Sequence, residues 1–226
     1  MEEVTLLARV PLFASLRPEY LSELAAKLVV RNYRRGEIIF HKDDPGSTLF
    51  IVKTGQVKIT SSSVAGEELI LAILTDTDFF GELSLLDGGL RSASATAMDP
   101  TQALALHRGD FLEVISSHAE RVGDILAAVA DRLRHTDLLL EDAVFLDLPA
   151  RLAKRLLELG EKRGLQTDHG LEIDLRLTQQ EIANTVGASR VAVNKLLGLF
   201  QDKGLVRIDK QRITIISPDE LRKRVY

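Results

Sequence analysis

The sequence has 226 residues, 45% of them hydrophobic and none of them cysteine. This length allows one large core or two smaller ones, and the lack of cysteine excludes disulfides, thiolate zinc sites and cysteine-held iron–sulfur clusters. The net charge of −4 is uneven, because residues 1–149 carry 14 basic and 23 acidic side chains whereas residues 150–226 carry 15 and 10, and a basic C-terminal part favours a nucleic-acid partner there.

Membrane and export signals are missing from the sequence. No apolar run approaches the roughly 20 residues that span a bilayer, and the first residues, Met1-Glu2-Glu3, lack the basic start of a secretory signal. We therefore expect a cytoplasmic protein with no membrane partner.

The N-terminal half begins with a helical pattern and continues with strands. Apolar residues at helical spacing predict a helix from Leu21 to Val29. Short β-rich runs separated by Gly, Pro and Asp turns then predict strands at Glu37–Phe40, Thr48–Val52, Gln56–Thr60, Glu68–Leu74, Ser94–Ala97 and Thr101–Leu106. Such spacing indicates an antiparallel sandwich or barrel.

A long helix is predicted from about Arg121 to Phe145. Its apolar residues follow a heptad repeat made of two interleaved series, Val122, Val129, Thr136 and Ala143 with Leu126, Leu133 and Leu140. A helix buried against its own domain would need a wider apolar stripe. We therefore expect this stripe to join two identical chains in a twofold homodimer.

The C-terminal part carries a two-helix motif after a hinge near Asp147 and Pro149. A new helix is predicted from Pro149 to about Lys162. Farther along, Thr178 and Glu181 form a capping box, Gly187 supplies a tight turn, and Ser189 caps a second helix.

This arrangement predicts a helix-turn-helix followed by a β-hairpin wing built from 205–208 and 212–216. The alternative is an ordinary helical hairpin. Near the start of the second helix, Arg190, Asn194 and Lys195 are expected to be exposed, and Arg and Asn are suited to guanine and adenine edges in the major groove. We expect the DNA contacts to come from Thr178, Gln179, Ser189, Arg190, Val191, Asn194 and Lys195.

The stretch from Phe79 to Leu86, with Arg91 and Ser92 after it, predicts a ligand site. Gly81 allows close approach of the backbone, and Arg91 and Ser92 can hold a phosphate diester. Glu82 is suited to a ribose hydroxyl. In the alternative, Glu82 and Arg91 merely pair with each other. The candidate ligand residues in this stretch are Gly81, Glu82, Leu83, Ser84, Arg91 and Ser92.

These motifs together give the chain a strong family resemblance. From 11–13, through 36–40, 52–57 and 81–83, to the helix-turn-helix, it resembles the Crp/Fnr family of bacterial regulators. The resemblance implies an α+β protein with a cyclic-nucleotide-binding antiparallel β-barrel (a double-stranded β-helix), a long dimerisation helix and a C-terminal winged helix-turn-helix. The implied limits are 1–112, 113–146 and 147–226.

The resemblance also implies roles for residues outside the ligand stretch. In cyclic-AMP-responsive members a Thr and a neighbouring polar residue of the dimer helix contact the adenine, and Thr136 and Asp137 match them. Asp137 stands where a Ser is found, and its carboxylate could accept from the adenine amino group. In the second DNA helix, Val191 replaces a base-reading Glu and Lys195 replaces an Arg, so a different half-site is expected.

The sequence therefore predicts a transcription regulator that binds a pseudo-palindromic double-stranded DNA operator under control of cyclic AMP. RNA polymerase is the further partner that we expect. The alternatives are another trigger, such as cyclic-di-GMP, or no ligand. Catalytic motifs are absent and the five His residues lack ligand spacing, so we expect no enzyme, metal, haem or iron–sulfur cluster.

Overall fold

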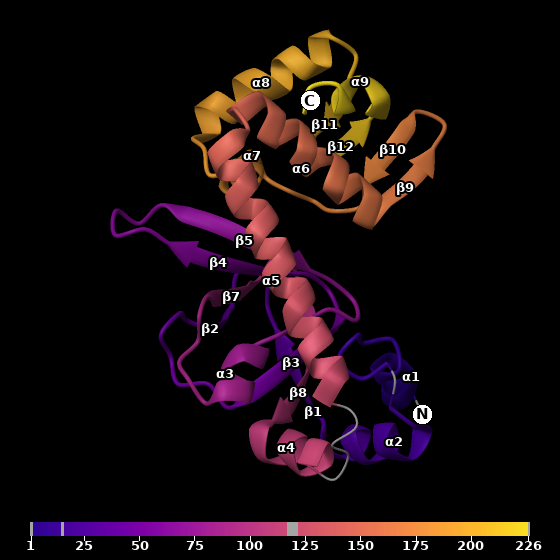
Figure 1. The fold of residues 1–226 in the computed structure, drawn as a ribbon. Coiled ribbons are helices and arrows are strands. Elements are labelled where there is room, and N and C mark those ends of the chain that lie inside the picture. Colours follow the sequence, from indigo (N-terminus) through magenta and orange to yellow (C-terminus); the bar gives the residue numbers. More distant parts are fainter. Residues whose placement is uncertain (1, 15, 117–121, 226) are drawn as a thin grey trace. The chain divides into compact units, whose positions relative to one another are not determined.

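The computed structural model describes residues 2–14, 16–116 and 122–225. The chain separates into two compact units, each described here by itself: Met1–Ser61 with Leu71–His135, and Ser62–Ile70 with Thr136–Tyr226. Helix α5 (Val122–Phe145) contributes residues to both units (Figure 1). The domain limits expected at 112 and 146 stay a prediction.

The strands of the N-terminal half form two four-stranded sheets, ordered β1-β8-β3-β6 and β2-β7-β4-β5. Their bounds are β1 (Val29–Tyr33), β2 (Ile38–Phe40), β3 (Thr48–Thr54), β4 (Val57–Ser62), β5 (Glu68–Leu74), β6 (Phe79–Phe80), β7 (Ser94–Ala97) and β8 (Thr101–His107). The pairings with a described register are antiparallel. The antiparallel fold is confirmed, as an open sandwich of two sheets rather than a closed barrel.

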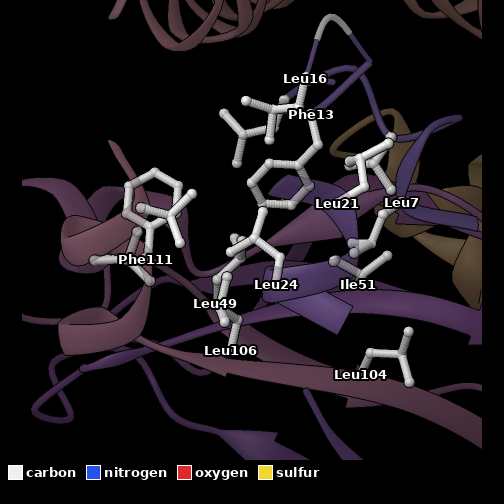
Figure 2. Close-up of a cluster of buried hydrophobic side chains, with 14 of the residues drawn as sticks. Leu7, Phe13, Leu16, Leu21, Leu24, Leu49, Ile51, Leu104, Leu106 and Phe111 are labelled. Atoms are coloured by element: carbon white, nitrogen blue, oxygen red, sulfur yellow. The ribbon is translucent and has the colours of Figure 1, made fainter. Parts of the chain in front are cut away.

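Strands β3 and β8 are buried on both faces, which explains their nearly continuous apolar sequence. Successive side chains of a strand point to opposite faces. Leu49, Ile51, Leu104 and Leu106 therefore pack toward the helices, whereas Phe50, Val52, Ala103 and Ala105 pack into the second cluster of the sandwich. Figure 2 shows the first cluster, where Leu24 and Phe111 meet these strand residues.

Helices on the other side of the first cluster contribute further buried side chains to it. They include α1 (Glu2–Leu7), α2 (Pro18–Lys27), α3 (Glu82–Asp87) and α4 (Arg108–Ser116). The helix predicted from Leu21 to Val29 was wrong at its end, because α2 stops at Lys27. The chain is already extended at Leu28, and Val29 pairs with Ala105, because a β-branched residue beside an open strand gains more from the sheet than from another helical residue.

Helix α5 has one buried apolar side and one exposed apolar side. Ile125 is buried in the first cluster, and Ala128 packs against it. In contrast, Leu126, Leu133 and Leu140 are 62%, 62% and 65% exposed. Arg121, the expected start, and the side chain of Val122 lie outside the described residues. The helix therefore packs against the first cluster on one side and exposes the predicted leucine series on another.

The second unit consists of helices around a small sheet. The helices are α6 (Leu148–Arg163), α7 (Gln179–Thr185), α8 (Arg190–Asp202) and α9 (Pro218–Arg222). The sheet has the order β11-β12-β10-β9, with β9 (Gly164–Thr167), β10 (Gly170–Ile173), β11 (Val206–Asp209) and β12 (Arg212–Ile215). The predicted wing is thus the β11–β12 hairpin, enlarged by a second hairpin that the sequence did not indicate.

The predicted hinge coincides with the start of α6. Asp147 is the N-cap, and its Oδ1 accepts a hydrogen bond of 2.9 Å from the Ala150 amide. Pro149 occupies the first turn, where its missing N–H costs nothing. Lys154 of α6 pairs with Asp142 near the end of α5 at 2.6 Å. The chain therefore changes direction between two helices that are joined by local polar contacts.

Candidate functional site

A pocket opens in the first unit beside the start of α3. Its lining includes all six residues that the sequence predicts there, namely Gly81, Glu82, Leu83, Ser84, Arg91 and Ser92. Phe40, Ile59, Phe80, Ala93 and Arg132 complete it. Thr136 and Asp137 are exposed residues of α5 in the second unit, and they are not among the lining residues.

Arg91 is buried, at 5% exposed, and hydrogen bonds fix the orientation of its guanidinium. Its Nη1 donates to the Gly81 carbonyl at 2.9 Å and to Ser84 Oγ at 2.7 Å, and its Nη2 donates to the Thr48 carbonyl at 2.8 Å. Within the described residues Arg91 forms no ion pair, and its Nε is buried without a partner. The predicted alternative, a Glu82–Arg91 pair, is therefore not formed.

The electrostatics of Arg91 suit an anionic ligand. Burial lowers the pKa of its guanidinium, and the negative charges of Glu82 and Asp44 oppose this shift. Guanidinium stays protonated at any physiological pH. A buried cation bonded only to neutral acceptors has lost hydration that an anion in the same pocket would replace.

Two glycines provide the space that Arg91 occupies. Gly81 has φ 80°, and a Cβ there would overlap Arg91 Nη1 and the Thr48 carbonyl. A Cβ on Gly46 would overlap Ser84 Oγ and Arg91 Nε. Gly81 was predicted as a pocket residue because it allows close approach of the backbone to a ligand, and its role in leaving space for Arg91 was not foreseen. Gly46 was not predicted at all, because nothing in its neighbouring sequence indicates that a residue 45 positions away packs against it.

Glu82 is paired with a residue that the sequence did not indicate. Its Oε1 lies 3.0 Å from Nη1 of Arg132 in α5. Glu82 is 4% exposed, and its Oε2 is buried with no hydrogen-bond partner. One carboxylate oxygen is therefore fixed and the other is an unused acceptor in a residue that lines the pocket, as a ribose hydroxyl would require.

The two serines differ in what they offer. Ser84 is 1% exposed, and its Oγ donates to the Gly81 carbonyl at 3.3 Å while accepting from Arg91. It therefore supports Arg91. Ser92 is exposed and lines the pocket, so its hydroxyl is the one positioned to meet a ligand.

In the second unit, the helix-turn-helix has the predicted geometry. Thr178 caps α7 in a complete capping box with Glu181. Gly187, at φ 62°, makes the turn. Ser189 caps α8 by accepting from the Ala192 amide at 3.3 Å. These contacts fix the start of α8 relative to α7.

The side chains predicted to read DNA are not all equally exposed. Gln179, Arg190 and Lys195 are exposed, and Val191 is 75% exposed. The prediction that Asn194 is exposed was wrong, because Asn194 is half-buried and its Oδ1 is enclosed without a partner. Asn194 directly follows the buried Val193, which places it at the border of the apolar stripe.

Comparisons with known proteins match the two parts of the chain that carry these residues. The model of the cyclic nucleotide-binding domain matches residues 30–118, and that of the Crp-like helix-turn-helix domain matches residues 150–224. A "CRP-like cAMP-activated global transcriptional regulator" of Mycobacterium tuberculosis is 36% identical over 224 residues, 99% of each chain. The chain belongs to the Crp/Fnr family.

As a Crp/Fnr member, the protein is a DNA-binding transcription regulator with a cyclic nucleotide-binding domain, and not an enzyme. A "Global nitrogen regulator" of Synechococcus elongatus is 31% identical over 87% of this chain and 90% of its own. The solved structure of CLP from Xanthomonas campestris, described as "c-di-GMP responsive", has a TM-score of 0.76 at 23% identity, over 88% of this chain and 99% of its own. Through the described part of the chain, no helix is long and apolar enough to cross a membrane.

The Gly46→Ala variant should lose about tenfold in affinity for a cyclic nucleotide, because the added methyl overlaps Arg91 and Ser84 and overpacking typically costs ~1–3 kcal/mol. Titration with a fluorescent cyclic nucleotide measures this change. Gly109→Ala is the matched control, since a Cβ there meets nothing within 4 Å. Equal affinity of Gly46→Ala and the wild type would contradict the steric role of Gly46.

Proposed function

We propose that this Crp/Fnr protein is a homodimer that binds a pseudo-palindromic operator under the control of cyclic AMP. The observation that carries this proposal is the pair of buried, incompletely partnered charges in one pocket. Arg91 is a cation without an ion pair, and Glu82 has a free buried oxygen. A cyclic nucleotide presents both complements, a phosphate diester and a ribose hydroxyl, close together.

Each pocket residue receives one task in this proposal. Arg91 and Ser92 bind the phosphate, and Glu82 accepts from the ribose 2′-hydroxyl. Gly81 and Ser84 keep Arg91 in place, and Leu83, 38% exposed, lines the pocket. The relative named as cAMP-activated supports cyclic AMP, rather than another cyclic nucleotide, as the proposed effector. Thr136 and Asp137 are assigned to its adenine.

The dimer rests on the exposed series Leu126, Leu133 and Leu140 of α5. Seven-residue spacing lets two such helices pack along their whole length. Val129 is half-buried, and Thr136 and Ala143 are exposed in the same stripe. Thr136 would therefore lie where two copies of α5 meet, which gives a small ligand a route to influence dimer geometry.

The DNA-binding surface is the start of α8 with the start of α7. Arg190 is assigned to a guanine edge and Val191 to a thymine methyl, with Lys195 reaching a base or a phosphate. Ser189, the N-cap of α8, and the half-buried Asn194 are assigned to the same DNA-binding surface. Thr178 and Gln179, at the start of α7, are assigned to the DNA backbone. The operator half-sites would be one helical turn apart, about 34 Å.

Control would operate as a shift between two arrangements of the DNA-binding units. A nucleotide that engages Glu82 also acts on its partner Arg132, and α5 continues from Arg132 to the hinge at Asp147. Coupling of this kind is typically worth about 1–3 kcal/mol. RNA polymerase is the partner through which bound regulator would affect transcription, and the cytoplasm is the expected location.

Calorimetric titration of the full-length protein with cyclic AMP should give micromolar or tighter binding. Arg91→Ala should weaken it roughly a hundredfold, because the phosphate loses its charge-assisted hydrogen bonds to the buried guanidinium, while nonspecific DNA binding is unchanged. Cyclic GMP, cyclic-di-GMP and 2′-deoxy cyclic AMP are the comparison ligands. The deoxy analogue should bind about 5- to 150-fold more weakly, since it leaves Glu82 Oε2 unpaired at a cost of ~1–3 kcal/mol.

Binding of cyclic-di-GMP alone would replace the proposed effector by another trigger. Binding of none of these nucleotides, with operator affinity already maximal, would instead mean ligand-independent DNA binding.

Arg190→Ala should reduce the ratio of specific to nonspecific DNA affinity by about 5- to 150-fold, the ~1–3 kcal/mol of one bidentate base contact. Operator selection followed by competition binding measures this ratio. Lys203→Ala, at the opposite end of α8, is the matched control and should leave the ratio unchanged. An unaltered ratio in Arg190→Ala would remove Arg190 from base recognition.

Leu133→Glu should convert the dimer to a monomer, because it places two like charges in the middle of the proposed stripe, where they would be desolvated. Analytical ultracentrifugation measures the state. Leu90→Glu, at a 59% exposed site outside α5, controls for the added charge. A Leu133→Glu protein that remains dimeric would show that α5 does not form the interface.

A further inference from the structure

Three phenylalanines form a ring cluster beside Arg91, and two of them, Phe40 and Phe50, lie within 6 Å of its guanidinium. Phe50 of β3 and Phe80 of β6 are cross-strand partners, and their rings stack at 5.2 Å between centroids and 17° between planes. Phe40, at the end of β2 in the other sheet, closes the cluster at 5.9 Å from Phe50 and 5.8 Å from Phe80. The Phe40 ring is therefore packed against both of the other rings.

The guanidinium carbon of Arg91 lies 4.2 Å from the centroid of the Phe40 ring. The corresponding distance to the Phe50 ring is 5.8 Å. A ring face carries partial negative charge and attracts a cation within about 6 Å. Phe40 therefore makes the closer of the two contacts, and it is also the one of these two rings that lines the pocket.

The ring complements the polar contacts of Arg91. Carbonyl oxygens of Gly81 and Thr48 and the hydroxyl of Ser84 bind the edge of the guanidinium. Hydrogen bonds lie in the guanidinium plane and leave its two faces unsatisfied. Phe40 covers one face with a surface that is apolar enough to pack in the sandwich and negative enough to favour the cation.

We propose that Phe40 is a positioning residue for Arg91: its ring orients the guanidinium for an anionic ligand and takes the place of a counter-ion in the empty pocket. A carboxylate in this position would neutralise Arg91 and compete with the ligand phosphate. An aromatic ring stabilises the cation without doing so. The effect on nucleotide affinity rests on the function proposed above for Arg91, whereas the stacking itself does not.

Phe40→Leu should weaken cyclic AMP binding roughly 3- to 30-fold, the range that a partly or fully desolvated cation–π contact supports. Phe40→Tyr and Phe40→Trp keep a ring face and should restore most of the affinity. Ile39→Leu, next to Phe40 on β2 and packed against the second cluster of the sandwich but outside the pocket lining, is the matched control. A Phe40→Leu protein that binds like the wild type would overturn the proposal.

A double-mutant cycle separates positioning from direct contact with the ligand. Arg91→Lys keeps a charge but loses the planar fork. If Phe40 acts through Arg91, Phe40→Leu should add little to the loss already caused by Arg91→Lys. Fully additive losses would show that Phe40 contacts the nucleotide itself, which overturns a positioning role.

NMR of the ligand-free protein tests the stacking without any nucleotide. The Nε–H resonance that disappears in Arg91→Lys should be displaced by the ring current of Phe40, and it should return toward its ordinary shift in Phe40→Leu but not in Ile39→Leu. An unchanged resonance in Phe40→Leu would refute the contact. Wild-type protein that binds no cyclic nucleotide but shows this displacement would contradict the proposed function and leave Phe40 assigned to Arg91.

Discussion

The burial of one arginine side chain explains much of the first unit. Arg91 keeps its charge in the interior of a sandwich, where an unpaired cation is costly. Two carbonyls and a hydroxyl satisfy its edge, an aromatic ring covers a face, and Gly46 and Gly81 leave the space for it. None of these groups carries a negative charge, so the positive charge remains available to whatever enters the pocket.

Helix α5 connects this pocket to the remainder of the chain. One side packs Ile125 into the core, another pairs Arg132 with Glu82, and a third exposes a leucine series. A helix is rigid over this length because every turn is hydrogen-bonded to the next. The same element therefore contacts the carboxylate, carries the exposed leucine series that we propose as the dimer surface, and ends at the polar contacts of the hinge.

The sequence predicts those features that depend on neighbouring residues. The capping box at Thr178, the turn at Gly187, the start of α6 and the strands with clear alternation all follow from local chemistry, and all are present. The pocket motif around Gly81 was recognisable for the same reason. The half-buried state of Asn194 was not, because it depends on which neighbours cover the border of α8.

Features that depend on distant packing were missed. Arg132 and Glu82 are 50 positions apart, and Arg132 has no motif around it. Phe40 and Gly46 look like ordinary strand and turn residues until β2 is placed against Arg91. The β9–β10 hairpin is held in the sheet because Leu171 and Ile173 pair with β12, at separations of 44 and 40 residues.

The two oxygens of Glu82 have opposite effects on the stability of the ligand-free protein. Oε1 holds the ion pair with Arg132, whereas Oε2, a buried acceptor without a partner, costs about 1–3 kcal/mol. A donor that entered the pocket and bound Oε2 would recover this cost, so the same atom that would recognise a hydroxyl would also make the folded unit more stable when it is bound.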